Sequence, residues 1–382
     1  TPPRPRAGAT TIVVPADGPG DFATVQGAID FVPAANATRR IIFVRKGVYQ
    51  ELVRINSAKP LITLRGEDRK ETVIAYANNA NFNPNSRSVV WVDAGDWTVE
   101  NLSVRNLTPQ GGSQAEAIRT NAARSQIRNC DLYSFQDTLQ LNGWAYVENC
   151  YIEGDVDFMW GNAAAYFLNC ELKNVRTGGF YVQARTPQNQ PGFVYVSSRL
   201  SGAAGVTGTF LARIDPNVFP DSQVVYINSA MGTQVSPAGW LLNNATSSNT
   251  VRFWEYRSTD LNGAPLDVSQ RIASSRQISD AEATQLSDTN FVLGGWAPQT
   301  PPLTRVAEGR WEAGAGGFVS FTGKDSYVMH PPSGEPVAFK RVDATKPTEK
   351  QLAGYVGPYA SVEAEASYKV TPENGQLVVN ID

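Results

Sequence analysis

Histidine is almost absent from this chain of 382 residues, which contains only His330. A Ser-His-Asp or Cys-His mechanism needs a histidine beside its nucleophile, and catalytic zinc commonly takes two or three histidine ligands. Any hydrolytic chemistry built from the first 300 residues must therefore use other acids and bases.

Several other features are also missing. No window reaches 18 consecutive apolar residues, so we expect no membrane span. The net charge is −3 and there is no basic block, which argues against a nucleic-acid partner. The cysteines number only three and lack the close spacings of a metal site, so buried free thiols are favoured over a disulfide.

What the sequence does contain is a repeat of 20 residues. Cys130, Cys150 and Cys170 each follow an asparagine, and an apolar residue stands three places before each of them. A fixed period indicates one structural unit per repeat. Short strand-like runs continue the pattern on both sides, with equivalent positions at 101, 129, 149, 169, 197 and 228. This pattern predicts an all-β parallel β-helix, with the asparagines forming a ladder of amide hydrogen bonds at a turn.

The two ends of the chain differ from this repeat. Thr24 is placed to cap a short helix that ends at Pro33 and covers the open end of the stack. Residues 297–302 read as a linker, and short strand-like runs follow it. We therefore expect a β-helix domain over residues 8–300 and a small C-terminal β module of unknown role over residues 303–382.

Two acids share the register of the cysteine repeat. Asp137 lies seven residues after Cys130, and Asp157 lies seven residues after Cys150, whereas Thr177 holds that place after the third cysteine. Adjacent coils are about 4.8 Å apart, so the two carboxylates should repel and one should hold a proton near neutral pH. We expect the acids to be confined to these two coils. A structural role for aspartates in turns remains an alternative on spacing alone.

Neutral amides and an aromatic side chain surround the expected acid pair. Gln136 precedes Asp137, and Gln114 lies about one coil earlier; both suit stabilisation of an oxyanion, although turn or surface hydrogen bonding is an equal alternative. Trp160 offers a surface for sugar stacking, or else packs as a rim residue against loops.

Five segments together resemble the pectin methylesterase family in order and spacing. They are Asp17-Gly18-Pro19-Gly20-Asp21-Phe22, Gly47-Val48-Tyr49-Gln50-Glu51, Gln114-Ala115-Glu116-Ala117-Ile118, Gln136-Asp137-Thr138-Leu139 and Asp157-Phe158-Met159-Trp160-Gly161-Asn162. The resemblance spans about residues 11–297. It implies a right-handed parallel β-helix and a secreted, monomeric esterase that acts on pectin with no metal or cofactor.

The resemblance also implies roles for individual residues. Asp157 matches the nucleophile and Asp137 the general acid and base. Gln136 and Gln114 match the oxyanion-stabilising amides, and Arg213 matches the arginine that orients Asp157. A guanidinium fork suits that last role because it favours a charged carboxylate.

The substrate subsites are less well defined by the resemblance. Trp160 and Phe158 are the candidate substrate-binding residues, and the tryptophan that usually follows the family's arginine is absent from Leu211-Ala212-Arg213-Ile214-Asp215. Asp215 would repel a de-esterified polyanion and so favour highly methylated stretches of pectin. The alternatives are a non-catalytic polysaccharide-binding solenoid and, less favoured because histidine is lacking, a β-helix pectin lyase or polygalacturonase.

Overall fold

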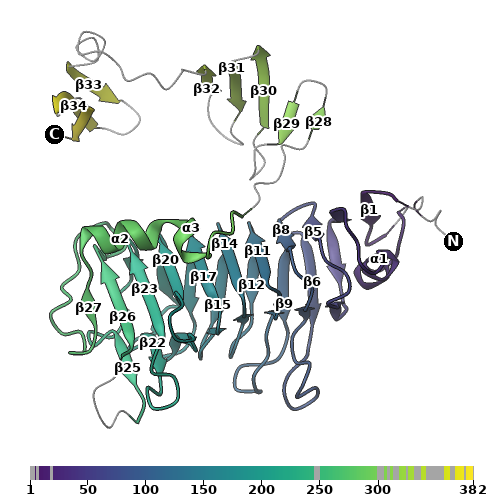
Figure 1. Cartoon of the computed structure of the whole chain (residues 1–382), viewed down its shortest axis with the longest axis horizontal. Helices are drawn as coiled ribbons and strands as arrows, with labels where there is room; N and C mark the ends of the chain where they lie inside the picture. The colour runs from purple at the N-terminus through teal and green to yellow at the C-terminus, as the bar shows by residue number, and fades with distance from the viewer. Residues whose placement is uncertain are drawn as a thin grey trace. The chain divides into compact units, whose positions relative to one another are not determined.

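The computed structural model describes residue 5, residues 8–17, 20–244 and 250–298, and beyond residue 304 only residues that lie in strands. The chain divides into two compact units, Thr1–Gln299 and Thr300–Asp382. The first unit contains three parallel sheets whose strands alternate along the chain, so that each coil adds one strand to each sheet (Figure 1). This is the architecture of the predicted parallel β-helix.

Sheet A is the longest of the three and has 11 strands. Its strands, in spatial order, are β1 (Thr11–Val14), β2 (Arg40–Val44), β5 (Ile62–Gly66), β8 (Trp97–Glu100), β11 (Arg124–Arg128), β14 (Trp144–Glu148), β17 (Ala164–Leu168), β20 (Phe193–Val196), β23 (Gln223–Ile227), β26 (Arg252–Tyr256) and β27 (Arg276–Gln277).

Sheets B and C have eight strands each. Sheet B contains β3 (Gly47–Tyr49), β6 (Thr72–Tyr76), β9 (Ser103–Asn106), β12 (Asp131–Tyr133), β15 (Tyr151–Gly154), β18 (Glu171–Asn174), β21 (Arg199–Gly202) and β24 (Ala230–Met231). Sheet C contains β4 (Val53–Ile55), β7 (Val90–Val92), β10 (Ile118–Thr120), β13 (Leu139–Leu141), β16 (Met159–Gly161), β19 (Phe180–Ala184), β22 (Phe210–Ile214) and β25 (Trp240–Leu242).

The equivalent positions of the repeat share a left-handed backbone conformation. Their φ angles lie between 48° and 57° at Asn101, Asn129, Asn149, Asn169, Ser197 and Asn228. Asparagine tolerates this region better than most residues with a side chain, which explains its recurrence at the turn between sheets A and B. The predicted amide ladder is present in one step: Asn169 Nδ2 donates to Asn149 Oδ1 at 2.7 Å. Asn101 instead donates to the backbone of Gly66 and Glu67.

The interior of the β-helix is apolar and continuous. The three cysteines following the asparagines are free and buried there. Further along, aromatic rings stack between consecutive coils, with centroids 4.3 Å apart for Phe167 and Tyr195 and 4.8 Å apart for Tyr195 and Tyr226. Stacking of equivalent side chains holds successive coils in register, and that register positions the polar residues discussed below.

Three helices accompany the sheets in the part of the chain that the structure describes. Helix α1 (Val25–Phe31) begins at Thr24, whose side chain accepts a hydrogen bond from the Gly27 amide, and it packs against β1, β2 and β4. Its role as an end cap stays a prediction. Helices α2 (Asp280–Ser287) and α3 (Thr289–Val292), which the sequence analysis did not anticipate, contact β20 and β17 of sheet A (Figure 1).

The second unit is antiparallel. One sheet contains β28 (Arg305–Ala307), β29 (Arg310–Glu312), β30 (Phe318–Gly323), β31 (Ser326–His330) and β32 (Val337–Lys340), and another contains β33 (Gly357–Ser361), β34 (Ala366–Glu373) and β35 (Gln376–Ile381). The predicted domain limits, 8–300 and 303–382, and the accessory role of the second region stay predictions.

Candidate active site

The two acids of the repeat stand on adjacent coils, just before β13 and β16. Leu139 lies opposite Met159, and Gln136 forms a parallel bridge with Val156, so the register places Asp137 opposite Asp157. Both acids have left-handed φ angles, 69° and 48°. A left-handed residue interrupts the extended strand conformation and, with it, the regular alternation of side chains between the two faces.

Asp157 is held by several donors. The guanidinium of Arg213 donates from Nε to Oδ1 at 2.8 Å and from Nη2 to Oδ2 at 2.6 Å, and Gln183 Nε2 donates to Oδ2 at 3.0 Å. Arg213 is itself fixed over the ring of Phe180, 4.2 Å from the centroid. Asp157 is only 5% exposed, so this two-pronged contact compensates a carboxylate largely removed from water. The predicted pairing of Arg213 with Asp157 is therefore present in the structure.

Asp137 has a different environment. Arg87 Nη2 donates to its Oδ2 at 2.9 Å, but Arg87 Nε donates to both carboxylate oxygens of Glu116, at 2.8 and 3.1 Å. Burial, followed by the charge of Glu116 and then that of Asp157, raises the pKa of Asp137 to about 8, although Arg87 and Arg185 oppose the rise. The raised pKa favours the protonated form of Asp137 at neutral pH.

The expectation that acids are confined to two coils is wrong. Ile118 lies opposite Leu139, and continuing this register back by two residues places Glu116 opposite Asp137. Glu116 is completely buried, and burial raises its pKa while Arg87 opposes the rise. The step between these coils is 21 residues rather than 20, so the cysteine repeat did not reveal the third acid.

The two candidate oxyanion amides lie on neighbouring coils and are partly exposed. The Ala115 amide donates to the Gln136 carbonyl at 3.1 Å, which places Gln114 next to the Gln136 coil. Ser113 Oγ donates to Gln114 Oε1 at 3.1 Å, a contact that uses the side-chain oxygen of Gln114 and not its amide nitrogen. Their catalytic roles stay predictions.

The two candidate substrate-binding aromatics differ sharply. Phe158 is 0% exposed and packs in the core against Tyr181, with ring centroids 5.2 Å apart, so its side chain offers no surface to a substrate. Trp160 is half-buried, and the guanidinium groups of Arg185 and Arg87 lie 4.6 and 5.5 Å from its ring centroid. Of the two aromatics, only Trp160 remains a candidate for contact with substrate.

The sequence analysis missed four residues of this site: Arg87, Glu116, Gln183 and Arg185. Gln183 lies opposite Trp160 after a step of 23 residues, which a fixed 20-residue spacing cannot locate. A signal existed for Glu116, because it is a charged residue placed between two apolar ones, Ala115 and Ala117, just before a buried strand.

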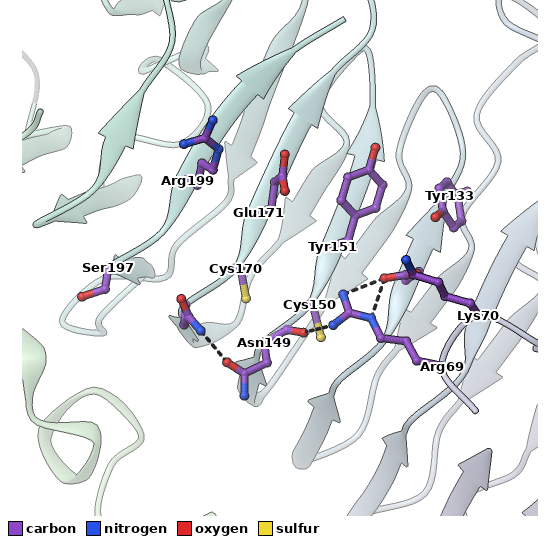
Figure 2. A pocket seen from close by; sticks show the side chains of 12 residues that line it. Arg69, Lys70, Tyr133, Asn149, Cys150, Tyr151, Cys170, Glu171, Ser197 and Arg199 are labelled. Atoms are coloured by element: carbon purple, nitrogen blue, oxygen red, sulfur yellow. Dashed lines mark hydrogen bonds and ion pairs between the residues drawn. The ribbon is translucent and has the colours of Figure 1, made fainter. Parts of the chain in front are cut away.

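A separate hollow of about 590 Å³ lies along sheet B (Figure 2). Arg69 reaches into it and donates to Asp131 Oδ1 at 2.6 Å and to the carbonyl of Asn149 at 2.8 Å. These contacts tie a loop to the starts of β12 and β15. The arginine is thus engaged in holding coils together, and the acids described above line no part of this hollow.

Within the described residues, no group of three or more histidine, cysteine, aspartate or glutamate side chains is placed to hold a metal ion. None of the helices in the described part of the chain has the length and apolarity required to cross a membrane.

Comparison with known proteins places this fold and site in a family. Residues 11–295 match the family model described as Pectinesterase. "Probable pectinesterase 49" of Arabidopsis thaliana is 32% identical over 301 residues, which cover 76% of this chain and 81% of the relative.

Similar solved structures agree with this family match. The pectin methylesterase from carrot superposes with a TM-score of 0.69 at 26% identity, covering 76% of this chain and 95% of that one. A pectin methylesterase in complex with a hexasaccharide gives a TM-score of 0.66 at 25% identity, covering 77% of this chain and 100% of the other.

The chain is thus a carboxylic ester hydrolase built on a right-handed parallel β-helix, and the predicted fold is confirmed. It belongs to the pectinesterase family. The predicted reaction, hydrolysis of methyl esters in pectin, is confirmed as the activity of that family.

Proposed function

We propose that this chain demethylates pectin by covalent catalysis, with Asp157 as the nucleophile and Asp137 as the general acid and base. The observation that carries the assignment is the difference between the two acids. Asp157 receives a two-pronged contact from Arg213, whereas the pKa of Asp137 is raised to about 8. A charged carboxylate beside a protonated one is the pair that nucleophilic attack and leaving-group protonation require.

In the first half of the reaction, an oxygen of Asp157 attacks the C6 carbonyl carbon of a methyl-esterified galacturonate. The carbonyl oxygen becomes an oxyanion, which Gln114 and Gln136 stabilise by donating from their side-chain amides. Asp137 gives its proton to the methoxy oxygen as the C6–OCH3 bond breaks, and methanol leaves. The product of this half is an anhydride between Asp157 and the sugar carboxyl group.

In the second half, Asp137 is a carboxylate and acts as the base. It takes a proton from a water molecule, and the resulting hydroxide attacks the C6 carbon of the anhydride. The bond to Asp157 breaks, the nucleophile is restored as a carboxylate, and the galacturonate leaves with a free acid. Arg213 orients Asp157 in both halves and compensates its charge whenever it departs as an anion.

The substrate proposed is methyl-esterified homogalacturonan. A hexasaccharide bound to a structurally similar pectin methylesterase supports an oligosaccharide-length cleft, and Trp160 is the aromatic surface proposed for it. Asp215 accepts from the Asn217 amide and from Asn244 Nδ2, and these hydrogen bonds lower the pKa of its side chain. Its fixed negative charge suits densely methylated stretches, so equal activity on sparsely methylated pectin would argue against this preference. We propose that the protein is secreted and monomeric.

The proposal is tested by incubating the protein with methylated pectin and following methanol release and chain length separately. Methanol without chain shortening is expected, and chain shortening would indicate a lyase or polygalacturonase instead. Asp157→Asn should abolish methanol release while leaving the far-UV circular dichroism spectrum unchanged. Asp30→Asn, on the exposed part of α1, is the matched control and should retain full activity. A variant at Asp157 that still turns over would refute the nucleophile.

A further inference from the structure

Glu116 is a buried carboxylate to which the proposed mechanism gives no part. It lies one coil before Asp137 in the column that continues to Asp157, and its side chain is 0% exposed. Both of its oxygens accept from Nε of Arg87, at 2.8 and 3.1 Å, and the same guanidinium donates from Nη2 to Asp137 at 2.9 Å. One arginine is therefore shared between two acids.

We propose that Glu116 is a positioning residue of the esterase reaction: it holds Arg87 so that a single N–H reaches Asp137, and it offsets the arginine's charge so that Asp137 keeps its proton at neutral pH. The inference rests on the role proposed above for Asp137. Glu116 itself is too deeply buried to touch substrate, so it acts through Arg87.

The charges around Asp137 show why Glu116 is needed. Arg87 and Arg185 favour the carboxylate form of Asp137, whereas Glu116 and Asp157 favour the protonated form. Arg213 binds Asp157 with two donors and so offsets much of the negative charge of that neighbour. Without Glu116, Asp137 would face an uncompensated arginine, as Asp157 faces Arg213, and the two acids would lose their chemical difference.

The same pairing fixes the geometry. Arg87 is held at Nε by Glu116 and at Nη2 by Asp137, and its guanidinium lies 5.5 Å from the ring centroid of Trp160. A planar group fixed at two donors has little freedom to rotate. Asp137 is consequently oriented as well as protonated, which a general acid requires if it is to reach the leaving oxygen.

The test is the pH dependence of kcat/KM for methanol release in the native protein and in Glu116→Gln. The alkaline limb of the native profile should fall near the pKa of Asp137, about 8. In Glu116→Gln the alkaline limb should move to lower pH by about one unit or more, because the negative charge of Glu116 is removed and the positive charge of Arg87 is left unbalanced. At pH 8 a one-unit shift should make the variant about fivefold slower, while at pH 5 its kcat and KM should approach native values.

Glu255→Gln is the matched control. Glu255 is 1% exposed and binds Arg271 from both oxygens, at 2.7 and 3.3 Å, but this pair contacts neither acid of the site. The alkaline limb of the Glu255→Gln profile should remain at the native pH. An unshifted limb in folded Glu116→Gln, or an equal loss of activity at every pH, would overturn the positioning role.

Glu116→Asp covers the case in which the glutamine variant does not fold. It keeps the negative charge but shortens the side chain, so the alkaline limb should stay near the native pH while kcat falls. Native kcat in this variant would overturn the inference. Asp137→Asn distinguishes a failure of the proposed mechanism from a failure of the role of Glu116. If Asp137→Asn remains active, the proposed mechanism fails. If Asp137→Asn is inactive but the alkaline limb of Glu116→Gln is unshifted, only the role of Glu116 is refuted.

Discussion

Replacing Asp137 by asparagine should abolish catalysis and, at the same time, stabilise the protein near neutral pH. Asp137 is 7% exposed, and burial is the largest cause of its raised pKa. In the unfolded chain its carboxyl group has an ordinary pKa of about 3.9. The native state therefore binds this proton more tightly than the unfolded state does, between about pH 4 and the folded pKa of about 8.

The sign and size of the effect follow from this difference. Below about pH 4 Asp137 is protonated in both the folded and the unfolded state, and its full contribution to the free energy of unfolding is present. As pH rises toward 8 the unfolded state releases its proton while the native state retains it, so stability falls by about 1.4 kcal/mol for each pH unit. Between pH 5 and pH 7 the native protein should thus lose about 3 kcal/mol through this one group.

Asparagine has nearly the same shape and does not titrate. Asp137→Asn should therefore gain about 3 kcal/mol relative to the native protein between pH 5 and pH 7. The measurement is urea unfolding followed by far-UV circular dichroism at pH 5, 6 and 7, with Asp30→Asn as a surface control. If the stability difference between Asp137→Asn and the native protein stays constant across this range, the proton on Asp137 has been wrongly assigned.

Substitutions at three further positions test other parts of the structure. Arg213→Lys should lower kcat about tenfold or more with a smaller change in KM, because a lysine cannot make the two-pronged contact with Asp157; a native kcat would contradict the orienting role. Phe158→Ala should lower the free energy of unfolding by about 3–5 kcal/mol, as for other buried aromatics. A raised KM with native stability would instead show that Phe158 contacts the substrate. Asn149→Ala, at a φ of 52°, should cost about 1–2 kcal/mol in urea unfolding, whereas Asn149→Gly should cost less; the reverse order would refute the conformational explanation of the repeat.

The sequence was informative about the fold because the constraint is local and repeats. A left-handed turn favours asparagine wherever it occurs, so the requirement is visible at Asn129, Asn149 and Asn169 without knowledge of any long-range contact. Helix α2 does begin at a capping box, Ser279 with Glu282, but this signal occurs once and is not reinforced by a repeat. Helices α2 and α3 are short and follow the last strand of sheet A, and they are held by contacts with that sheet, as when Tyr166 donates to the Ser287 carbonyl at 2.9 Å.

Spacing alone predicted the acid pair, because its residues keep the step of the repeat, whereas Arg213 was predicted from the family resemblance. Asp137 and Asp157 are separated by 20 residues, and their juxtaposition follows from the cysteine positions. Glu116 lies in the column of the two aspartates, and Gln183 lies in the column of Trp160, but both belong to coils whose loops lengthen the step to 21 and 23 residues. Arg87 lies 50 residues from the aspartate it contacts, a separation that only the folded chain reveals.

The chemical difference between the two aspartates arises from these less predictable residues. Both acids follow the same kind of turn, both have left-handed backbones, and both are almost fully buried. These shared features alone would give two equivalent acids, which cannot divide the work of nucleophile and proton donor. The division follows from how each arginine is used: Arg213 gives two donors to Asp157, whereas Arg87 divides its donors between Asp137 and Glu116. A repeat can therefore place two acids side by side, but the arginine contacts that distinguish them come from coils and loops outside the regular spacing.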